Sequence, residues 1–216
     1  MASTHRTRVL LADDHLMVAE ALTSLLSPEF DLVGVVEDGR QLIEAAGMLR
    51  PDVIVADITM PHLNGIDALI RLREEGNRVP VVFLTMHKDV TFARRALEAG
   101  ASGFVLKHSA SVELITALHA ALAGKTYLTP QLAGEVLDSM RQGPSEDTDP
   151  AASLTLRQRE VLQLLAEGLS AKEIAASLSI STRTVEFHKY QMMETLDLHS
   201  NAELIHFAIK HGLIEL

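Results

Sequence analysis

Apolar residues in the first half of the chain gather in short, continuous runs that are separated by longer amphipathic stretches. The runs are rich in Val, Ile and Leu and contain no regular polar positions, which is typical of strands buried on both faces of a parallel sheet. The stretches between them have helical spacing. Strand–helix alternation repeated five times predicts a doubly wound α/β domain with helices on both faces of a five-stranded sheet. The predicted strands are residues 8–12, 30–37, 52–56, 79–85 and 103–106.

The pattern changes after residue 125. Thr129 and Pro130 suit the start of a short helix, because proline is favoured at the first helical position. A polar, acidic segment punctuated by Pro and Gly follows at 141–153, which is typical of a flexible linker. Every pattern beyond it is helical, so we expect a separate all-α domain. The predicted organisation is a first domain at 1–125, a linker helix and flexible linker at 126–152, and a second domain at 153–216.

The second domain is predicted to contain four helices, two of which form a helix-turn-helix. Thr155 and Ser170 each precede an apolar-periodic stretch and suit helix N-caps, and Ser181 or Thr182 does the same for the third helix. A short helix, a tight turn and a longer helix are the order of a helix-turn-helix. The last helix is expected at 201–214.

The third helix of this domain has an apolar and a polar face. Val185, Met192 and Leu196 lie seven and four residues apart and predict an inner stripe, widened by Met193. The opposite face carries Arg183, Glu186, Phe187 and Tyr190. A small bundle with an inert polar face is the plain alternative, but a solvated face seldom carries two aromatic side chains.

Charge and composition narrow the function further. The net charge is −10, with 13 basic against 21 acidic residues in 1–150 and 6 against 8 in 151–216. This balance argues against broad, non-specific adhesion to phosphate polymers, so any nucleic-acid contact must be local. The chain has no cysteine, which excludes disulfides and thiolate metal sites. Its apolar start is too short for a signal peptide, and no stretch approaches the roughly 18 apolar residues of a spanning helix. We expect a cytoplasmic protein with no membrane partner.

Polar residues follow four of the predicted strands at their carboxyl ends. Because the carboxyl ends of parallel strands meet at one edge of a sheet, these side chains should converge there. Crowded carboxylates need a cation to stay ionised, and oxygen-only ligands with room for water favour Mg²⁺. One carboxylate could then attack phosphorus, with the hydroxyl and ammonium groups binding the phosphoryl oxygens. Strand-end acids often only cap helices, but a set of five suitable residues favours a site: Asp13, Asp14, Asp57, Thr85 and Lys107.

The stretches "LLADDH", "VIVADITMPHLNGID", "VVFLTMH" and "GASGFVLK" closely resemble the flavodoxin-like receiver domain of two-component response regulators. The resemblance covers residues 8–123 or so. It implies that Asp57 is the phosphoacceptor and that Mg²⁺ is held by Asp13, Asp14, Asp57 and the backbone carbonyl of Thr59. It also implies phosphoryl contacts from Thr85 and Lys107, and a switch aromatic at Phe104. His15, His62 and His87 lie near this edge and are left out of the site, although the resemblance suggests that His87 and Thr59 could tune the lifetime of the phosphoryl group.

The stretch "LTLRQREVLQLLAEGLSAKEIAASLSISTRTVEFH" closely resembles the LuxR-type DNA-binding domain, and the two resemblances together match NarL/FixJ-type response regulators. The resemblance implies that Glu186, Phe187 and Tyr190 face base edges in the major groove. The implied phosphate contacts are Lys172, Thr182, Arg183, Thr184 and Lys189.

The resemblance is incomplete near the end of the third helix. Gln191 and Thr195 stand where members of the family commonly carry Asn or basic residues, and Asp197 replaces a frequent glycine. Fewer cationic phosphate contacts predict weaker binding and a shallower salt dependence. A homodimer would then be needed for useful affinity, because two linked half-sites raise the effective concentration.

The predicted function is a response regulator that controls transcription. A sensor histidine kinase or a small phosphodonor would phosphorylate Asp57, and phosphorylation would control dimerisation and binding to double-stranded promoter DNA. Two alternatives remain: a regulator whose helix-turn-helix domain mainly contacts protein, and a DNA-binding protein switched without phosphorylation. The first is favoured by the acidic third helix, and the second is disfavoured by the complete acidic set. We do not expect an enzyme that acts on an external substrate, since no second catalytic constellation is present.

Overall fold

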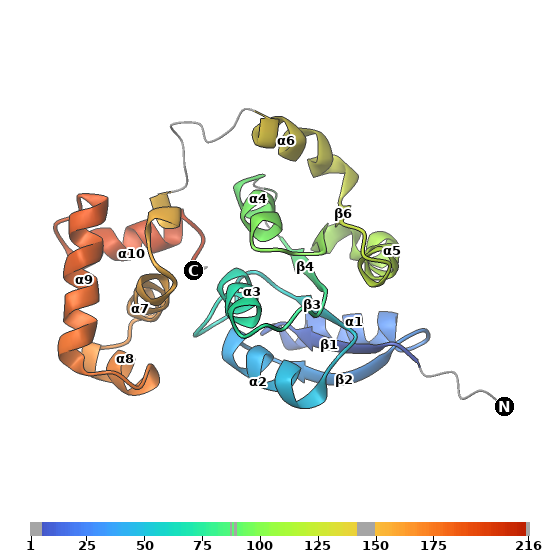
Figure 1. Ribbon diagram of the computed structural model, residues 1–216, viewed down its shortest axis with the longest axis horizontal. Coiled ribbons are helices and arrows are strands. Elements are labelled where there is room, and N and C mark those ends of the chain that lie inside the picture. The colour runs from blue at the N-terminus through green and yellow to red at the C-terminus, as the bar shows by residue number, and fades with distance from the viewer. Residues whose placement is uncertain (1–5, 87, 89, 142–149, 215–216) are drawn as a thin grey trace. The chain divides into compact units, whose positions relative to one another are not determined.

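The computed structural model describes residues 6–86, 88, 90–141 and 150–214, which form two compact units. The first unit is an α/β sandwich at the start of the chain, and the second is a helical domain at its end (Figure 1). Within the described residues, no helix is long and apolar enough to cross a membrane.

The first unit is built on a parallel sheet with the strand order β2-β1-β3-β4-β5-β6. The doubly wound parallel arrangement expected from the apolar runs is confirmed, but the expected count of five strands is wrong by one. A short sixth strand pairs in parallel with β5, matching Gly103 with Tyr127 and Phe104 with Leu128. Two residues are too few to leave a periodic signal in the sequence. The strands are β1 (Arg8–Ala12), β2 (Asp31–Val36), β3 (Val53–Ala56), β4 (Val81–Thr85), β5 (Gly103–Leu106) and β6 (Tyr127–Leu128).

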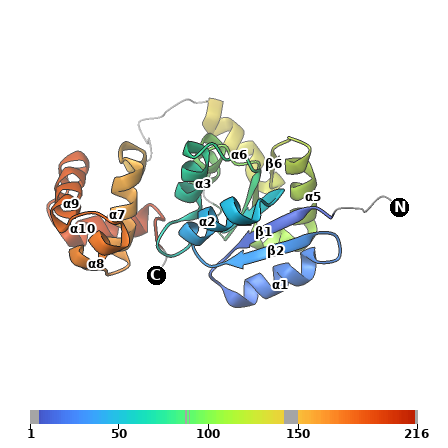
Figure 2. The same cartoon turned by 60° about the horizontal axis from the view of Figure 1, so that its bottom comes forward.

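Helices cover both faces of this sheet, as the continuous apolar strands require. Helices α1 and α5 pack on one face, where their apolar residues form a core with Val55, Leu84 and Val105. Figure 2 shows α1 and α2 on opposite sides of β1 and β2. The five helices that wind around the sheet are α1 (Leu16–Leu26), α2 (Gly39–Leu49), α3 (Gly65–Glu74), α4 (Val90–Glu98) and α5 (Ala110–Leu122).

Residues 126–141 still belong to the first unit. Helix α6 (Pro130–Arg141) packs against α4, and β6 extends the sheet. The buried Thr129, between β6 and α6, attaches this segment to β5. Its N–H donates to the carbonyl of Phe104 at 3.0 Å, and its hydroxyl accepts from Leu106 N–H at 3.3 Å. Residues 126–141, expected to form part of a linker, are therefore attached to the sheet where they are described.

The second unit contains the four expected helices: α7 (Leu156–Ala166), α8 (Ala171–Ser177), α9 (Thr182–Leu196) and α10 (Asn201–Lys210). Capping boxes begin α7 at Thr155 and α8 at Ser170. Ser181 rather than Thr182 caps α9, and its side chain accepts from Thr184 N–H at 3.1 Å. Apolar residues of all four helices form one core. Helices α8 and α9, joined by a short turn, are the helix-turn-helix.

Candidate functional site

The carboxyl ends of β1, β3, β4 and β5 bring the predicted acidic residues to one edge of the sheet. Asp13 and Asp57 follow β1 and β3 directly and are buried, whereas Asp14 is more exposed. Oxygen atoms of the three carboxylates and a ring nitrogen of His15 lie within 4.8 Å of one another. Thr85 ends β4 and is fully buried. Parallel pairing therefore assembles the acidic set that strand-end residues predicted.

Lys107 lies at the centre of this edge. Its Nζ is 2.6 Å from Oδ2 of Asp57 and 2.8 Å from Oδ2 of Asp13. Burial on its own would lower the pKa of Lys107, but Asp57 and Asp13 outweigh it and raise the pKa above its usual value. The ammonium group therefore remains charged and bridges the two buried carboxylates.

Asp57 is held from several directions. Its N–H donates to the carbonyl of Ala12 at 2.8 Å, and its Oδ1 accepts from Ile58 N–H at 2.7 Å. Burial raises the pKa of Asp57 from 3.8 to about 6, a shift that Lys107 opposes and Asp13 reinforces. Burial therefore disfavours the ionised form of Asp57. A bound cation, or loss of the negative charge, would relieve this cost.

The backbone of Asp57 also touches the start of α3. A Cβ atom added to Gly65 would meet the carbonyl oxygen of Asp57, and the Gly65 N–H donates to the carbonyl of Ile58 at 2.7 Å. Asn64 caps α3, because its Oδ1 accepts from Asp67 N–H at 2.9 Å. Glycine is needed here because the helix comes too close to the strand end for any side chain.

Phe104 lies on β5, three residues before Lys107, and its ring is fully buried in the core. Thr129 donates its N–H to the Phe104 carbonyl, and its hydroxyl accepts from Leu106 N–H two residues further along the strand. The hydroxyl of Thr129 donates in turn to Glu113 on α5 at 2.8 Å, and Glu113 also accepts from the Tyr127 hydroxyl at 3.2 Å. The sequence reasoning missed this polar connection, because nothing in the spacing of Glu113 and Thr129 indicates that they meet.

His15, which the sequence analysis left out of the site, lies beside the acidic residues. Its Nδ1 is 2.9 Å from Oδ1 of Asp14 and 3.4 Å from Oδ1 of Asp13. The only available signal was its place directly after Asp14. His87 lies outside the described residues.

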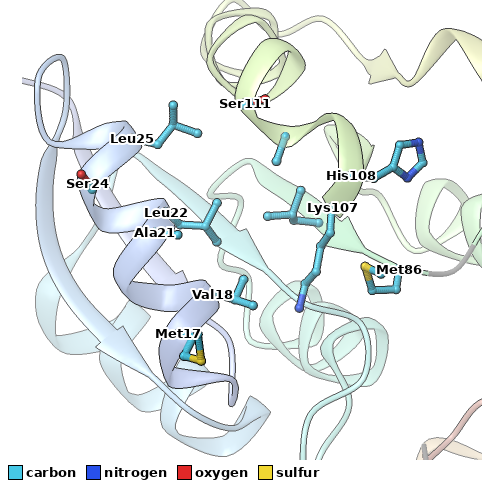
Figure 3. A pocket seen from close by; sticks show the side chains of 12 residues that line it. Met17, Val18, Ala21, Leu22, Ser24, Leu25, Met86, Lys107, His108 and Ser111 are labelled. Carbon is cyan, nitrogen blue, oxygen red and sulfur yellow. The ribbon is translucent and has the colours of Figure 1, made fainter.

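An apolar groove of about 660 Å³ between α1 and α5 borders the same edge. Met17, Val18 and Leu25 line it from α1, and Lys107 and His108 lie near its other end (Figure 3). On this side the acidic edge therefore borders a mostly apolar surface.

The acidic edge suits a hard divalent cation. It offers the carboxylate oxygens of Asp13, Asp14 and Asp57 within a short distance of one another and provides no sulfur ligand. Oxygen-only donors of this kind are the ligands that Mg²⁺ prefers. The residues present thus form an acidic pocket typical of a magnesium site.

The outer face of α9 presents the aromatic residues that the helical phase predicted. Phe187 and Tyr190 are 56% and 66% exposed, and Arg183 and Glu186 lie on the same exposed side. Val185 and Met192 are buried on the inner face. Asp197 ends the helix with φ at 53°, the left-handed conformation in which glycine is usual.

The residues predicted to contact phosphates differ in their exposure and in their side-chain partners. Lys172, Thr182 and Arg183 are exposed near the N-termini of α8 and α9, whereas the hydroxyl of Thr184 lies 2.8 Å from that of the cap Ser181. Lys189 differs from them, since its side chain is only 12% exposed and its Nζ lies 3.3 and 3.2 Å from the two carboxylate oxygens of Glu186.

Two family descriptions match separate parts of the chain. Residues 9–119 match the response regulator receiver domain, and residues 152–208 match the bacterial regulatory proteins of the luxR family. The first range runs from β1 into α5 of the α/β unit, and the second runs from before α7 into α10 of the helical unit. The chain is therefore a two-component response regulator with a receiver domain and a LuxR-type DNA-binding domain, and it regulates transcription.

Relatives of nearly the same length support this assignment. The virulence transcription regulator BvgA of Bordetella pertussis is 36% identical over 95% of this chain and 98% of its own. The oxygen regulatory protein NreC of Staphylococcus aureus is 32% identical over 96% of this chain and 99% of its own. The structure of RcsB from Salmonella enterica serovar Typhimurium, bound to a promoter in the presence of the phosphomimetic BeF₃⁻, is 25% identical and aligns with a TM-score of 0.63 over 94% of this chain and 98% of that chain. The chain belongs to the NarL/FixJ family of response regulators.

Membership in this family settles the broad class of activity. The protein is a transcription regulator and not an enzyme that turns over an external substrate. A receiver domain also implies a kinase as partner.

Proposed function

We propose that Asp57 accepts a phosphoryl group from a sensor histidine kinase or a small phosphodonor, and that this modification controls homodimerisation and sequence-specific binding to promoter DNA. The observation that carries the proposal is the position of Asp57. Its carboxylate is buried at the end of the central strand, 2.6 Å from the ammonium group of Lys107 and beside the carboxylate of Asp13.

The chemistry follows from these groups. A carboxylate oxygen of Asp57 attacks phosphorus, so that a new P–O bond forms while the bond from phosphorus to the donor nitrogen or oxygen breaks. The leaving group departs with the electron pair of that bond. Lys107 neutralises charge on the phosphoryl oxygens, and the Thr85 hydroxyl is placed at the adjacent strand end to donate to one of them.

Magnesium is the cofactor we propose for this step. Asp13, Asp14, Asp57 and the backbone carbonyl of Thr59 would hold the ion. When bound, Mg²⁺ supplies positive charge that offsets the repulsion between the carboxylates and the incoming phosphoryl group.

The switch that reports phosphorylation is proposed to include Thr85, Phe104 and the helices α4 and α5. The added charge at the strand end would bias this region between two arrangements. The hydrogen bonds of Thr129 to the backbone of Phe104 and Leu106 support this idea, because they link the switch strand to β6 and the start of α6.

For DNA binding we propose that α9 enters the major groove. Glu186, Phe187 and Tyr190 would face base edges, because the N-terminal half of the second helix of a helix-turn-helix reads the bases. Contacts to phosphates are proposed for Lys172, Thr182, Arg183 and Thr184, helped by the positive end of the helix dipole. Lys189 is not among these contacts, because its ammonium group is paired with Glu186.

Binding as a homodimer is part of the same proposal. The structure described as two RcsB dimers bound to two parallel DNAs is 26% identical to this chain and aligns with a TM-score of 0.57. Few exposed cations on α9 also favour pairing, since two linked half-sites compensate for weak single contacts.

A regulator that acts mainly through protein contacts is the second candidate. It is favoured by the absence of net positive charge on α9, where Arg183 and Lys189 are balanced by Glu186 and Glu194. The only lysine of this helix is also paired with Glu186.

Two measurements test the proposal. Incubation with acetyl phosphate and Mg²⁺ should add one phosphoryl group to the full-length protein and to the matched surface variant Asp31→Asn, but none to Asp57→Asn. Mobility-shift assays on genomic fragments, with and without BeF₃⁻ and at two salt concentrations, should show sequence-selective binding that the phosphate mimic strengthens. Binding that never becomes selective would favour the protein-contact alternative, and phosphorylation of Asp57→Asn would refute the assignment of the phosphoacceptor.

A further inference from the structure

Lys189 occupies an inward-facing position on α9. It follows Val185 by four residues and precedes Met192 by three, which places it on the stripe that packs into the domain core. Its side chain is only 12% exposed, whereas that of Glu186 is 54% exposed. The aliphatic part of the lysine is thus largely covered, and only its end emerges beside the outer face.

The ammonium group of Lys189 is already engaged where it emerges. It lies 3.3 Å from Oε1 and 3.2 Å from Oε2 of Glu186, so that both carboxylate oxygens share it. Glutamate three residues before lysine is a favourable order on a helix. A lysine whose stem is covered and whose charge is paired is poorly placed to reach a DNA phosphate.

The pairing with Lys189 would make it easier for the Glu186 carboxylate to enter the major groove. A carboxylate that enters the major groove approaches the phosphates on both sides and is repelled by them. The charge of Lys189 offsets that repulsion and limits the directions in which the carboxylate can point. Glu186 lies on the same exposed side of α9 as Phe187 and Tyr190, where its carboxylate can accept hydrogen bonds.

We propose that Lys189 is a positioning residue for Glu186 and not a phosphate contact, and that the pair selects cytosine through its exocyclic N4 amino group. Carboxylates accept from the cytosine amino group in the major groove, and apolar side chains contact the thymine methyl group. The operator should therefore contain a cytosine opposite Glu186, with thymine at neighbouring positions contacted by Phe187 and Tyr190. This inference rests on the proposed DNA-binding function and names the bases that it would recognise.

The test is selection of bound duplexes from a randomised DNA library by the full-length protein with BeF₃⁻, followed by affinity measurements on the selected site. The Glu186→Ala variant should lose the preference for cytosine at one position, by about fivefold to a hundredfold. The Lys189→Met variant keeps the aliphatic stem and should lose much of the same preference while the slope of log K against log salt stays unchanged. The Lys189→Arg variant retains the charge and should keep the preference for cytosine that Lys189→Met loses.

Lys172→Met is the matched control for a phosphate contact. It should weaken binding to all sequences equally and reduce the salt slope by about one. If Lys189→Met behaves in that way and leaves base preference intact, the inference is wrong. A selected site with no cytosine or with a preference that Glu186→Ala leaves unchanged also overturns it. Unchanged thermal unfolding of each variant shows that the differences do not come from misfolding.

The outcomes separate this inference from the proposed function. If the wild-type protein selects no sequence at all, the DNA-binding proposal itself fails. If it selects a site whose base preference is independent of Glu186 and Lys189, only the role of this pair is refuted.

Discussion

The Nζ atom of Lys107 lies 2.6 Å from Oδ2 of Asp57, close enough for a charge-assisted hydrogen bond between two largely buried groups. The same nitrogen contacts Asp13 at 2.8 Å. One ammonium group therefore serves two carboxylates, and the pKa of Asp57 remains raised to about 6 because burial outweighs its pairing with Lys107. The ionised carboxylate of Asp57 is therefore held in an electrostatically unfavourable environment.

This relationship predicts that neutralising Asp57 stabilises the unmodified protein. A folded-state pKa above the ordinary 3.8 means that the ionised form is disfavoured on folding. The cost therefore grows as the pH rises from about 4 to about 6 and is constant above that range. Asp57→Asn should raise the free energy of unfolding by about 1–3 kcal/mol above pH 7 and by less near pH 4, measured by urea denaturation without divalent cations.

The exposed Asp31 provides the matched control for this measurement. Asp31→Asn should change the free energy of unfolding by no more than about 0.5 kcal/mol at either pH. A gain for Asp57→Asn that increases toward acid pH would contradict the assigned direction of the pKa shift.

The close approach of Gly65 to Asp57 makes a second prediction. A methyl group at residue 65 would collide with the carbonyl oxygen of Asp57 and also press on Phe83. Gly65→Ala should cost about 1–3 kcal/mol of stability and slow phosphoryl incorporation, because the backbone of the phosphoacceptor must move. Thermal unfolding and acetyl phosphate labelling measure the two effects.

Gly47 is the control for Gly65. It also lies in a helix, but an added Cβ would meet nothing within 4 Å. Gly47→Ala should therefore stabilise the protein by about 0.5–1 kcal/mol, since alanine loses less conformational freedom on folding. Equal effects of the two substitutions would rule out the steric explanation.

The acidic edge was predictable from the sequence for a simple reason. Parallel strands with continuous apolar runs place their carboxyl ends together, so Asp13, Asp57 and Lys107 had to meet once the strands were recognised. Helix caps at Thr155 and Ser170 were predictable because capping depends on residues three apart in the chain.

The parts that could not be predicted depend on contacts between distant segments. Strand β6 has only two residues, and it forms because Thr129 meets β5 and Glu113, which no local pattern reveals. The inward position of Lys189 was available from the helical phase, but a lysine is normally assigned to the solvent face. Its pairing with Glu186 became evident only from the positions of the side chains.

The hydroxyl of Thr129 should contribute measurably to the free energy of unfolding, because it holds the segment after α5 on the sheet. Replacing it with valine leaves the N–H of Leu106 and the carboxylate of Glu113 without this hydroxyl in a buried place. Thr129→Val should reduce the free energy of unfolding by about 1–3 kcal/mol and increase hydrogen exchange in β6 and the start of α6. Thr129→Ser should retain most of the stability, and Thr126→Val, at an exposed position nearby, should have little effect. A neutral Thr129→Val would show that the Thr129 hydroxyl is not needed to hold β6, whose backbone still pairs with β5.

Thr59 and His87 are predicted to set the lifetime of the phosphoryl group. In the sequence, Thr59 follows β3 and His87 follows β4, and both strands end at the acidic edge. The double variant Thr59→Ala/His87→Ala should lose phosphoryl faster than the wild type, because smaller side chains admit water more freely. Release of labelled phosphate from the phosphorylated full-length protein measures the rate, and an unchanged rate contradicts the hypothesis.

Helix α9 carries few basic side chains that could contact DNA phosphates. Thr195 is exposed near the end of the helix, so Thr195→Lys adds a charge without disturbing the core. If α9 lies in the major groove, the new charge should contact a phosphate, tighten binding at low salt and steepen the slope of log K against log salt by about one. Ala202→Lys adds the same charge at an exposed position on α10 and should leave the slope nearly unchanged. Equal gains from both variants would indicate a general effect of net charge, whereas a gain confined to Thr195→Lys would support contact between α9 and the DNA backbone.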